Sequence, residues 1–270
     1  MADIFSVSVT TIQRWLKELG CKRERRIYQV NENYFESIDS DEKAYWLGFL
    51  SADGYIHEGR NTITLELQES DKFHIEKFKK AISATYPIKE IIHKLDKEYT
   101  HYRITITSKK MVNDLAKYNV IQNKSLIFIP PKNINKNYLN YWIAGYMDGD
   151  GCLWQARERF KICFTGTYET LSFIKNYFHS DNKISLEHRC KNTYKFVLDV
   201  DNAERFLYDI KYDKLSYALE RKKMRYCSFC AATRNCSDVN CWETLTVRPV
   251  GNQQPSSFLE KVQRLSLKRV

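Results

Sequence analysis

A short motif that occurs twice constrains this chain more than any other feature. The first copy occupies residues 45–54 and reads YWLGFLSADG, and the second occupies residues 141–151 and reads YWIAGYMDGDG. Both copies end in Asp-Gly, with the acids Asp53 and Asp150 about one small domain apart. A repeat on this scale predicts two related halves with a pseudo-symmetric site between them.

Each copy predicts an apolar helix with small residues one turn apart. These residues are Gly48 with Ala52 in the first copy and Gly145 with Gly149 in the second. Faces without bulky side chains let two helix backbones approach closely. We therefore expect the two helices to cross at these residues.

The acid at the end of each predicted helix precedes a glycine, Gly54 or Gly151, that we expect in the left-handed conformation that ends helices. Carboxylates there face the negative end of the helix dipole, and two of them side by side repel. A divalent cation such as Mg²⁺, or Mn²⁺ in its place, would favour the arrangement, because Mg²⁺ binds through one or two carboxylates together with water and phosphate. For a single copy, an ordinary helix end is the simpler explanation.

The repeated motif resembles that of the LAGLIDADG homing endonucleases, in their single-chain form with two motifs. On the nine-letter pattern the copies are residues 46–54 and 143–151, and the eighth letter, the metal-binding acid of the family, falls on Asp53 and Asp150. The sixth letter, usually Asp, is Ser51 in the first copy and Asp148 in the second. The Tyr-Trp pair of each copy is displaced by one residue between copies, so we expect it to serve packing.

The resemblance covers about residues 34–226 and implies a site-specific enzyme that makes staggered cuts in both strands of a long DNA target. It implies metal-assisted phosphodiester hydrolysis, with divalent ions held by Asp53, Asp150 and the backbone carbonyls of Ala52 and Gly149.

The resemblance also suggests basic residues that assist the site. Lys124 and Lys214 follow the two halves at matching places. A lysine near the scissile phosphate would stabilise developing charge or help orient the attacking water. Solvated loop lysines are the alternative interpretation.

After each motif, the residue pattern predicts hairpin, helix, hairpin and helix. Polar and apolar residues alternate in residues 62–68, 101–107, 157–165 and 189–198, as in half-buried strands. Residues 73–81, 111–118, 171–178 and 203–210 are expected to be helical. The fold class is thus α+β, with two pseudo-symmetric αββαββα halves, residues 44–130 and 131–226, that form a β-saddle.

The polar faces of these strands are expected to bind DNA. Arg, Lys, Gln and Thr supply base-edge and phosphate contacts in the major groove. The alternative is the ordinary solvated face of an antiparallel sheet. The predicted DNA-binding residues are Thr64, Glu66, Gln68, Arg103, Thr105, Arg157, Arg159, Lys161, Arg189, Lys191 and Lys195.

Residues 1–26 predict a small helical module of helix-turn-helix type, followed by a polar linker over residues 27–43. Ser8 would cap its helix and Gly20 would end it. We expect Gln13 and Arg14 to point outward, as in a recognition helix, although an amphipathic helix lying on the main domain is the alternative. The face expected to be buried consists of Ile12, Trp15, Leu16 and Leu19.

The charged, mostly basic segment over residues 211–226 is expected to bind phosphates or to form a solvated helix face. The tail over residues 227–270 contains four cysteines that we expect to be free thiols, and the alternative is a four-cysteine zinc site, for which their number would suffice. These cysteines are Cys227, Cys230, Cys236 and Cys241.

A net charge of +10 favours polyanion partners. No apolar run reaches membrane-spanning length and no signal peptide is evident, so we expect a monomer in the cytoplasm or the organellar matrix or nucleoid, not secreted and not on a membrane. The expected partner is double-stranded DNA, and intron RNA is possible. The main alternative is a non-cleaving protein on the same scaffold, an intron maturase or a transcription regulator, and a structural zinc protein is a third.

Overall fold

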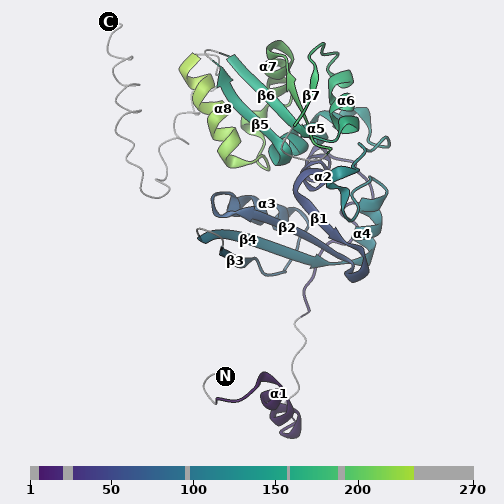
Figure 1. The fold of residues 1–270 in the computed structure, drawn as a ribbon, viewed down its shortest axis with the longest axis vertical. Coiled ribbons are helices and arrows are strands. Elements are labelled where there is room, and N and C mark those ends of the chain that lie inside the picture. The colour runs from purple at the N-terminus through teal and green to yellow at the C-terminus, as the bar shows by residue number, and fades with distance from the viewer. Residues whose placement is uncertain (1–5, 21–26, 95–97, 157–158, 188–191, 234–270) are drawn as a thin grey trace, which may run out of the picture.

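The computed structural model describes residues 6–20, 27–94, 98–156, 159–187 and 192–233, and Figure 1 shows its two halves with helices α2 and α5 between them. The first half runs through α2 (Asp41–Asp53), β1 (Gly54–His57), β2 (Thr62–Gln68), α3 (Lys72–Ala81), β3 (Lys89–Lys94), β4 (Glu98–Thr107) and α4 (Lys109–Ala116).

The second half repeats this order of elements. It runs through α5 (Lys136–Asp150), β5 (Gly151–Ala156), β6 (Arg159–Gly166), α6 (Tyr168–Tyr177), β7 (Ile184–Leu186), β8 (Tyr194–Leu198) and α7 (Val200–Asp209). The sheets are antiparallel, and their strand orders, β1-β2-β4-β3 and β5-β6-β8-β7, correspond strand for strand. The predicted α+β fold with two αββαββα halves is confirmed.

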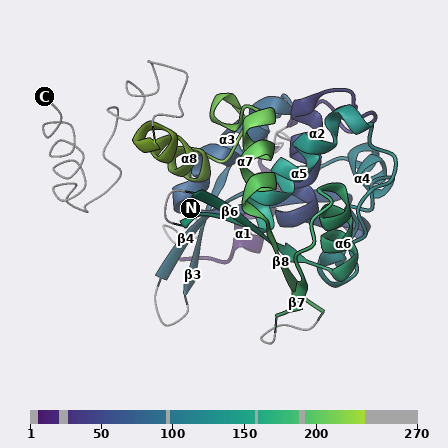
Figure 2. The same cartoon turned by 90° about the horizontal axis from the view of Figure 1, so that it is seen from above.

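The alternation in the sequence determines which face of each sheet is buried. In β2, Ile63 and Leu65 are fully buried while Thr64 and Glu66 face the other way. In β6, Phe160, Ile162 and Phe164 are fully buried. Figure 2 shows β3, β4 and β7 extending away from α2 and α4. Each sheet therefore keeps one polar face that the helices do not cover.

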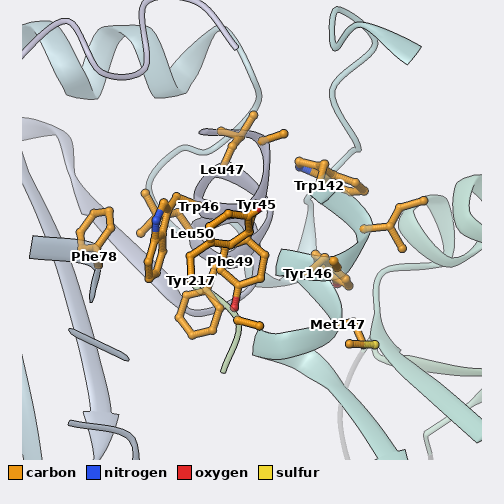
Figure 3. Packing of buried hydrophobic residues seen from close by; sticks show 14 of the residues in the cluster. Tyr45, Trp46, Leu47, Phe49, Leu50, Phe78, Trp142, Tyr146, Met147 and Tyr217 are labelled. Atoms are coloured by element: carbon orange, nitrogen blue, oxygen red, sulfur yellow. The ribbon is translucent and has the colours of Figure 1, made fainter. Parts of the chain in front are cut away.

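Aromatic residues of α2 and α5 fill the core around the helix pair. Trp46 packs on Phe78 of α3, with ring centroids 5.1 Å apart, and Trp142 packs on Phe173 of α6 at 5.9 Å. Each tryptophan is fully buried within its own half. Figure 3 shows these groups around the labelled residues Tyr45, Trp46, Phe49, Phe78, Trp142, Tyr146, Met147 and Tyr217. The packing role expected for the repeated tryptophans is confirmed.

The stretch expected to be a polar linker, residues 27–43, is part of the first half. Tyr34 and Phe35 are buried, and the backbone N–H of Asn31 donates to the carbonyl oxygen of Ile82. The helix also begins earlier than expected, because Ser40 caps it through the N–H of Lys43 at 3.3 Å. The linker expectation missed these residues because the segment is held by hydrogen bonds to Ile82 and Thr85, which follow α3 and are distant in sequence.

The N-terminal helix α1 (Val9–Glu18) forms with the predicted cap, since the Thr11 N–H donates to Ser8 Oγ at 3.1 Å. The expectation that its apolar face is buried is wrong for the part of the chain that the structure describes. No residue of α1 is buried, Trp15 and Leu16 are each 39% exposed, and Leu19 is 75% exposed. The rest of the module lies outside the described residues.

A further helix, α8 (Glu220–Thr233), extends past the expected end of the second half at residue 226. None of the described helices is long and apolar enough to span a membrane.

Candidate metal and nucleic-acid site

The site is built on the crossing of α2 and α5. A Cβ atom added to Gly48 would overlap the carbonyl oxygen of Trp142, and one added to Gly145 would overlap the carbonyl oxygen of Tyr45. Each repeat therefore makes the same contact with the other repeat. Glycine at both positions therefore sets how closely the helices approach, as the small-residue pattern predicted.

The glycines that follow the acids correct one expectation. Gly54 has φ −72° and Gly151 has φ −101°, so both are extended rather than left-handed. The physical reason for glycine is a close approach to the preceding helical turn. A Cβ at Gly54 would lie 2.6 Å from the carbonyl oxygen of Leu50, and a Cβ at Gly151 would overlap that of Met147.

Asp53 and Asp150 line one cavity of about 400 Å³, to which both halves contribute. The second half also lines it with Tyr146 and Thr167. A Cβ added to Gly149 would lie 3.4 Å from Oδ2 of Asp53, which places this carboxylate against the last turn of α5. The structure thus brings the two acids of the repeat together.

Both carboxylates have an electrostatic reason to bind a proton or a cation. Burial among protein atoms raises the pKa of Asp53 to about 7, with a further contribution from the charge of Asp150, while Lys222 and Lys124 act in the opposite direction. Burial likewise raises the pKa of Asp150. Both residues are nevertheless exposed to solvent on the cavity side, and this access reduces the cost of ionising them.

Lys124 lies at the cavity, as predicted, in the 3₁₀ turn Lys124–Leu126. The lysine is buried, and its Nζ donates to the carbonyl oxygen of Ala52 at 2.9 Å. Burial lowers its pKa, and the charges of Asp150 and Asp53 oppose that shift. The Ala52 carbonyl, predicted as a metal ligand, therefore already accepts one hydrogen bond. Metal ligation by it and by Gly149 stays a prediction.

The predicted counterpart, Lys214, is an exposed residue of the 3₁₀ turn Tyr212–Lys214, and the described lining of the cavity does not include it. Lys222 of α8 approaches the acids instead and was missed. It is 3% exposed, and its Nζ donates to the carbonyl oxygens of Met147, Asp148 and Gly151 at 2.6, 2.8 and 2.6 Å.

A signal for Lys222 was present in the charge run over residues 211–226. Leu219, Lys222 and Tyr226 have helical spacing and so share one face. Leu219 is buried and Tyr226 packs against the core. A lysine between two core residues on one helix face indicates a buried amine that needs acceptors.

Asp148, the sixth letter of the second motif, is a buried hydrogen-bond acceptor. Its carboxylate accepts from Tyr45 Oη at 2.6 Å, Tyr212 Oη at 2.6 Å and the Leu219 N–H at 2.8 Å. Burial raises its pKa. At the equivalent position of the first motif, the Ser51 hydroxyl donates only locally, to the Leu47 carbonyl at 2.8 Å. The repeat is therefore asymmetric here, and Asp148 links α5 to α2 and to the segment before α8.

The predicted DNA-binding residues of the first sheet lie on its polar face, but several bond to each other. Thr64 and Thr105 share a hydrogen bond of 3.1 Å. Arg103 Nε donates to Glu66 Oε2 at 2.5 Å. Gln68 donates to Asp71 at 3.1 Å. Base reading by Glu66 or Arg103 would require this ion pair to open.

In the second sheet, Lys161 is half-buried on the polar face of β6. Arg159 is drawn to α7 instead, where it pairs with Asp201 at 2.6 Å and Glu204 at 2.8 Å. Lys195 forms an ion pair with Glu187. The remaining predicted contacts of this sheet, Arg157, Arg189 and Lys191, lie outside the described residues.

The other predicted sites are only partly visible. Arg14 lies 3.9 Å from Glu18 on α1, which is exposed, and Gln13 is also exposed. Cys227 is buried in α8. The side chain of Cys230, and Cys236 and Cys241 altogether, lie outside what the structure describes, so the zinc site stays a prediction.

Comparison with known proteins gives few sequence relatives and clear structural ones. No family model matches the chain. A stretch of 132 residues is 29% identical to the uncharacterized protein MJ0314 of Methanocaldococcus jannaschii, covering 46% of this chain and 44% of that protein. The chain thus spans less than half the length of this relative.

The homing endonuclease I-WcaI bound to its DNA recognition sequence superposes with a TM-score of 0.52 and 15% identity, covering 77% of this chain and 96% of that one. The LAGLIDADG meganuclease I-AabMI bound to uncleaved DNA gives a TM-score of 0.45 and 15% identity, covering 71% and 90%. The first likeness shows that this chain shares the fold of I-WcaI.

Proposed function

We propose that this chain is a LAGLIDADG-type homing endonuclease, which hydrolyses phosphodiester bonds in both strands of a specific DNA site with a divalent metal ion. The observation that carries the proposal is the placement of Asp53 and Asp150, one from each repeat, in one cavity at the crossing of α2 and α5. Support also comes from the shared fold of I-WcaI, which is described as a homing endonuclease bound to its recognition sequence.

The acid pair fits Mg²⁺ or Mn²⁺. Burial raises the pKa of both carboxylates, and the charge of Asp150 raises that of Asp53 further. A bound cation would stabilise the ionised pair by compensating this repulsion. When bound, such an ion supplies charge stabilisation and an activated water for hydrolysis. Asp53 and Asp150 would hold it.

The chain's own residues fix the acids and moderate their charge. Lys124 and Lys222 donate to carbonyl oxygens at the ends of α2 and α5, where cations are favourable. Lys124 lines the cavity, so it would contact a phosphate bound there. The glycines of the crossing hold the two helix ends in register.

The polar sheet faces would bind the duplex on either side of this cavity. A net charge of +10 supports binding to phosphates, which release counterions as they are neutralised. With both acids in one chain, the protein would act as a monomer on a long site, in the cytoplasm or an organellar matrix.

A cleavage assay tests the proposal. The full-length protein is incubated with a plasmid carrying the uninterrupted insertion locus while Mg²⁺ is titrated, and linear product is expected. Asp53→Asn and Asp150→Asn should each abolish cutting of at least one strand while DNA binding, measured by gel shift, is retained. Asp181→Asn, which changes an exposed carboxylate of the second half, is the matched control.

Two outcomes would redirect the interpretation. Normal cleavage by both Asn variants would overturn the assignment of the acids. Specific DNA or intron RNA binding without product in Mg²⁺ or Mn²⁺ would favour the non-cleaving regulator or maturase.

A further inference from the structure

A second group of ligating side chains lies on the polar face of the first sheet. Glu66 of β2, His93 of β3 and His101 of β4 converge there. His93 Nε2 lies 2.7 Å from Glu66 Oε1, and His101 Nδ1 lies 3.3 Å from the same oxygen. All three ligand atoms lie within 4.8 Å of one another.

The sheet itself produces this convergence. Between β2 and β4, Glu66 is paired with Arg103, which lies two residues from His101. Between β4 and β3, His101 is paired with Ile91, which lies two residues from His93. Side chains two residues apart on a strand share a face. Three neighbouring strands therefore each contribute one ligand to the same patch.

The donor set suits a first-row transition ion. Two imidazole nitrogens and one carboxylate oxygen are the protein ligands of many Zn²⁺ sites with one open position. Zn–ligand bonds of about 2.0–2.2 Å in tetrahedral geometry separate ligand atoms by about 3.3–3.5 Å. The histidine nitrogens lie 2.7 and 3.3 Å from Glu66 Oε1, and all three ligand atoms lie within 4.8 Å of one another, so side-chain rotations would admit the ion.

Arg103 completes the arrangement from outside. It donates to Oε2 of Glu66 and leaves Oε1 directed at the histidines. Carboxylate ligands held by such an outer partner are typical of metal centres. The side chains of Glu66, His93 and His101 are 22%, 41% and 36% exposed, so an ion has access.

We propose that Glu66, His93 and His101 form a Zn²⁺ site, separate from the acid pair at the helix crossing. Binding would join β2, β4 and β3 through one ion and release any proton held on the ligating nitrogens. The site would add positive charge to the face proposed to bind DNA, but its existence does not depend on the proposed nuclease function.

Zinc titration of the full-length chain tests this site. Cys230, Cys236 and Cys241 are first changed to serine so that tail thiols do not compete, and excess Mg²⁺ is present to occupy the acid pair. Isothermal titration calorimetry should show one Zn²⁺ per chain. His93→Ala and His101→Ala should each lose more affinity than the roughly 10–100-fold typical of a lost outer partner.

Two further variants keep the result interpretable. His179→Asn removes an exposed imidazole at a left-handed position that Asn also accepts, and its zinc affinity should match the parent. Glu66→Gln preserves shape if an alanine variant misfolds by circular dichroism, and it should also weaken binding. The proposal is overturned if the parent binds no Zn²⁺, or if folded His93, His101 or Glu66 variants bind it as tightly as the parent.

Discussion

At the scale of single residues, the acids proposed to bind metal differ in their surroundings from an acid that holds the fold together. Asp53 and Asp150 line a cavity, and the surrounding protein atoms raise the pKa of both carboxylates more than the nearby lysines lower it. Asp148, two residues before Asp150, is fully engaged by Tyr45, Tyr212 and the Leu219 N–H. The sixth and eighth letters of the second motif therefore have different surroundings.

The stability of the metal-free protein should depend on pH through Asp53. Its pKa rises from about 4 in the unfolded chain to about 7 in the native state, so ionisation costs the native state more, and stability falls as pH increases through this window. Asp53→Asn lacks this charge. Its melting temperature should be close to that of the wild type near pH 4 and exceed it increasingly up to about pH 8. Parallel melting profiles in chelator would contradict the raised pKa.

Asp148→Ala should destabilise the fold far more than Ser51→Ala at the equivalent position. It leaves Tyr212 Oη and the Leu219 N–H without their acceptor, each costing about 1–3 kcal/mol, and leaves Tyr45 Oη with His74 Nε2 at 3.3 Å, whereas Ser51→Ala loses one hydrogen bond worth about 0.5–1.5 kcal/mol. Urea unfolding of both variants measures the difference. Equal free energies of unfolding would show that Asp148 does not link the halves.

At the scale of elements, the crossing of α2 and α5 is the contact on which the site geometry depends. The backbones meet where Gly48 and Gly145 leave no Cβ atom, so the distance between the helix ends follows from these two positions. The carbonyl oxygens at those ends are in turn held by Lys124 and Lys222.

Gly48→Ala and Gly145→Ala should each cost about 1–3 kcal/mol of unfolding free energy or more, because the added methyl group meets a backbone carbonyl that cannot rotate away. Gly59→Ala is the control, since its nearest neighbour would be the flexible His57 side chain at 3.6 Å, and its effect should stay within about 0.5 kcal/mol. Thermal denaturation of the three variants provides the comparison. A Gly48→Ala protein as stable as Gly59→Ala would contradict the tight crossing.

Periodicity was enough to predict most of these elements. The alternation around Ile63 and Phe160 gave the strands and their buried faces, and the repeat gave the helix pair with its acids. Contacts between distant segments were not predictable in this way. Phe35 is buried because it packs into the core of the first half. Lys222 lies near the acids, where Lys214 was predicted, because α8 packs against the end of α5.

At the scale of the whole molecule, two sheets with polar faces flank one cavity, and the charge on those faces is uneven. In the first sheet, the Glu66 carboxylate is hydrogen-bonded to His93 and Arg103. In the second, Arg159 turns to α7 while Lys161 remains on the face. Phosphate contact in the second sheet is thus expected from Lys161.

Lys161→Ala should weaken DNA binding across sequences and reduce the slope of log affinity against log salt by about 1, as for a lost phosphate contact. Lys175→Ala is the control, because its Nζ donates to the carbonyl oxygens of Asp181 and Asn182 beside α6. Fluorescence anisotropy over a range of salt concentrations measures both slopes. An unchanged slope for Lys161→Ala would remove this residue from the interface.

The asymmetry between Ser51 and Asp148 has an evolutionary consequence. A homodimer assembled from the first repeat would carry serine twice and lose the carboxylate acceptor for Tyr45, leaving only the His74 contact, and one assembled from the second would supply two carboxylates without the Tyr45 hydroxyl. The duplicated copies have therefore become complementary parts. A symmetric dimer of either copy would need further substitutions at this junction to restore the hydrogen bonds seen here.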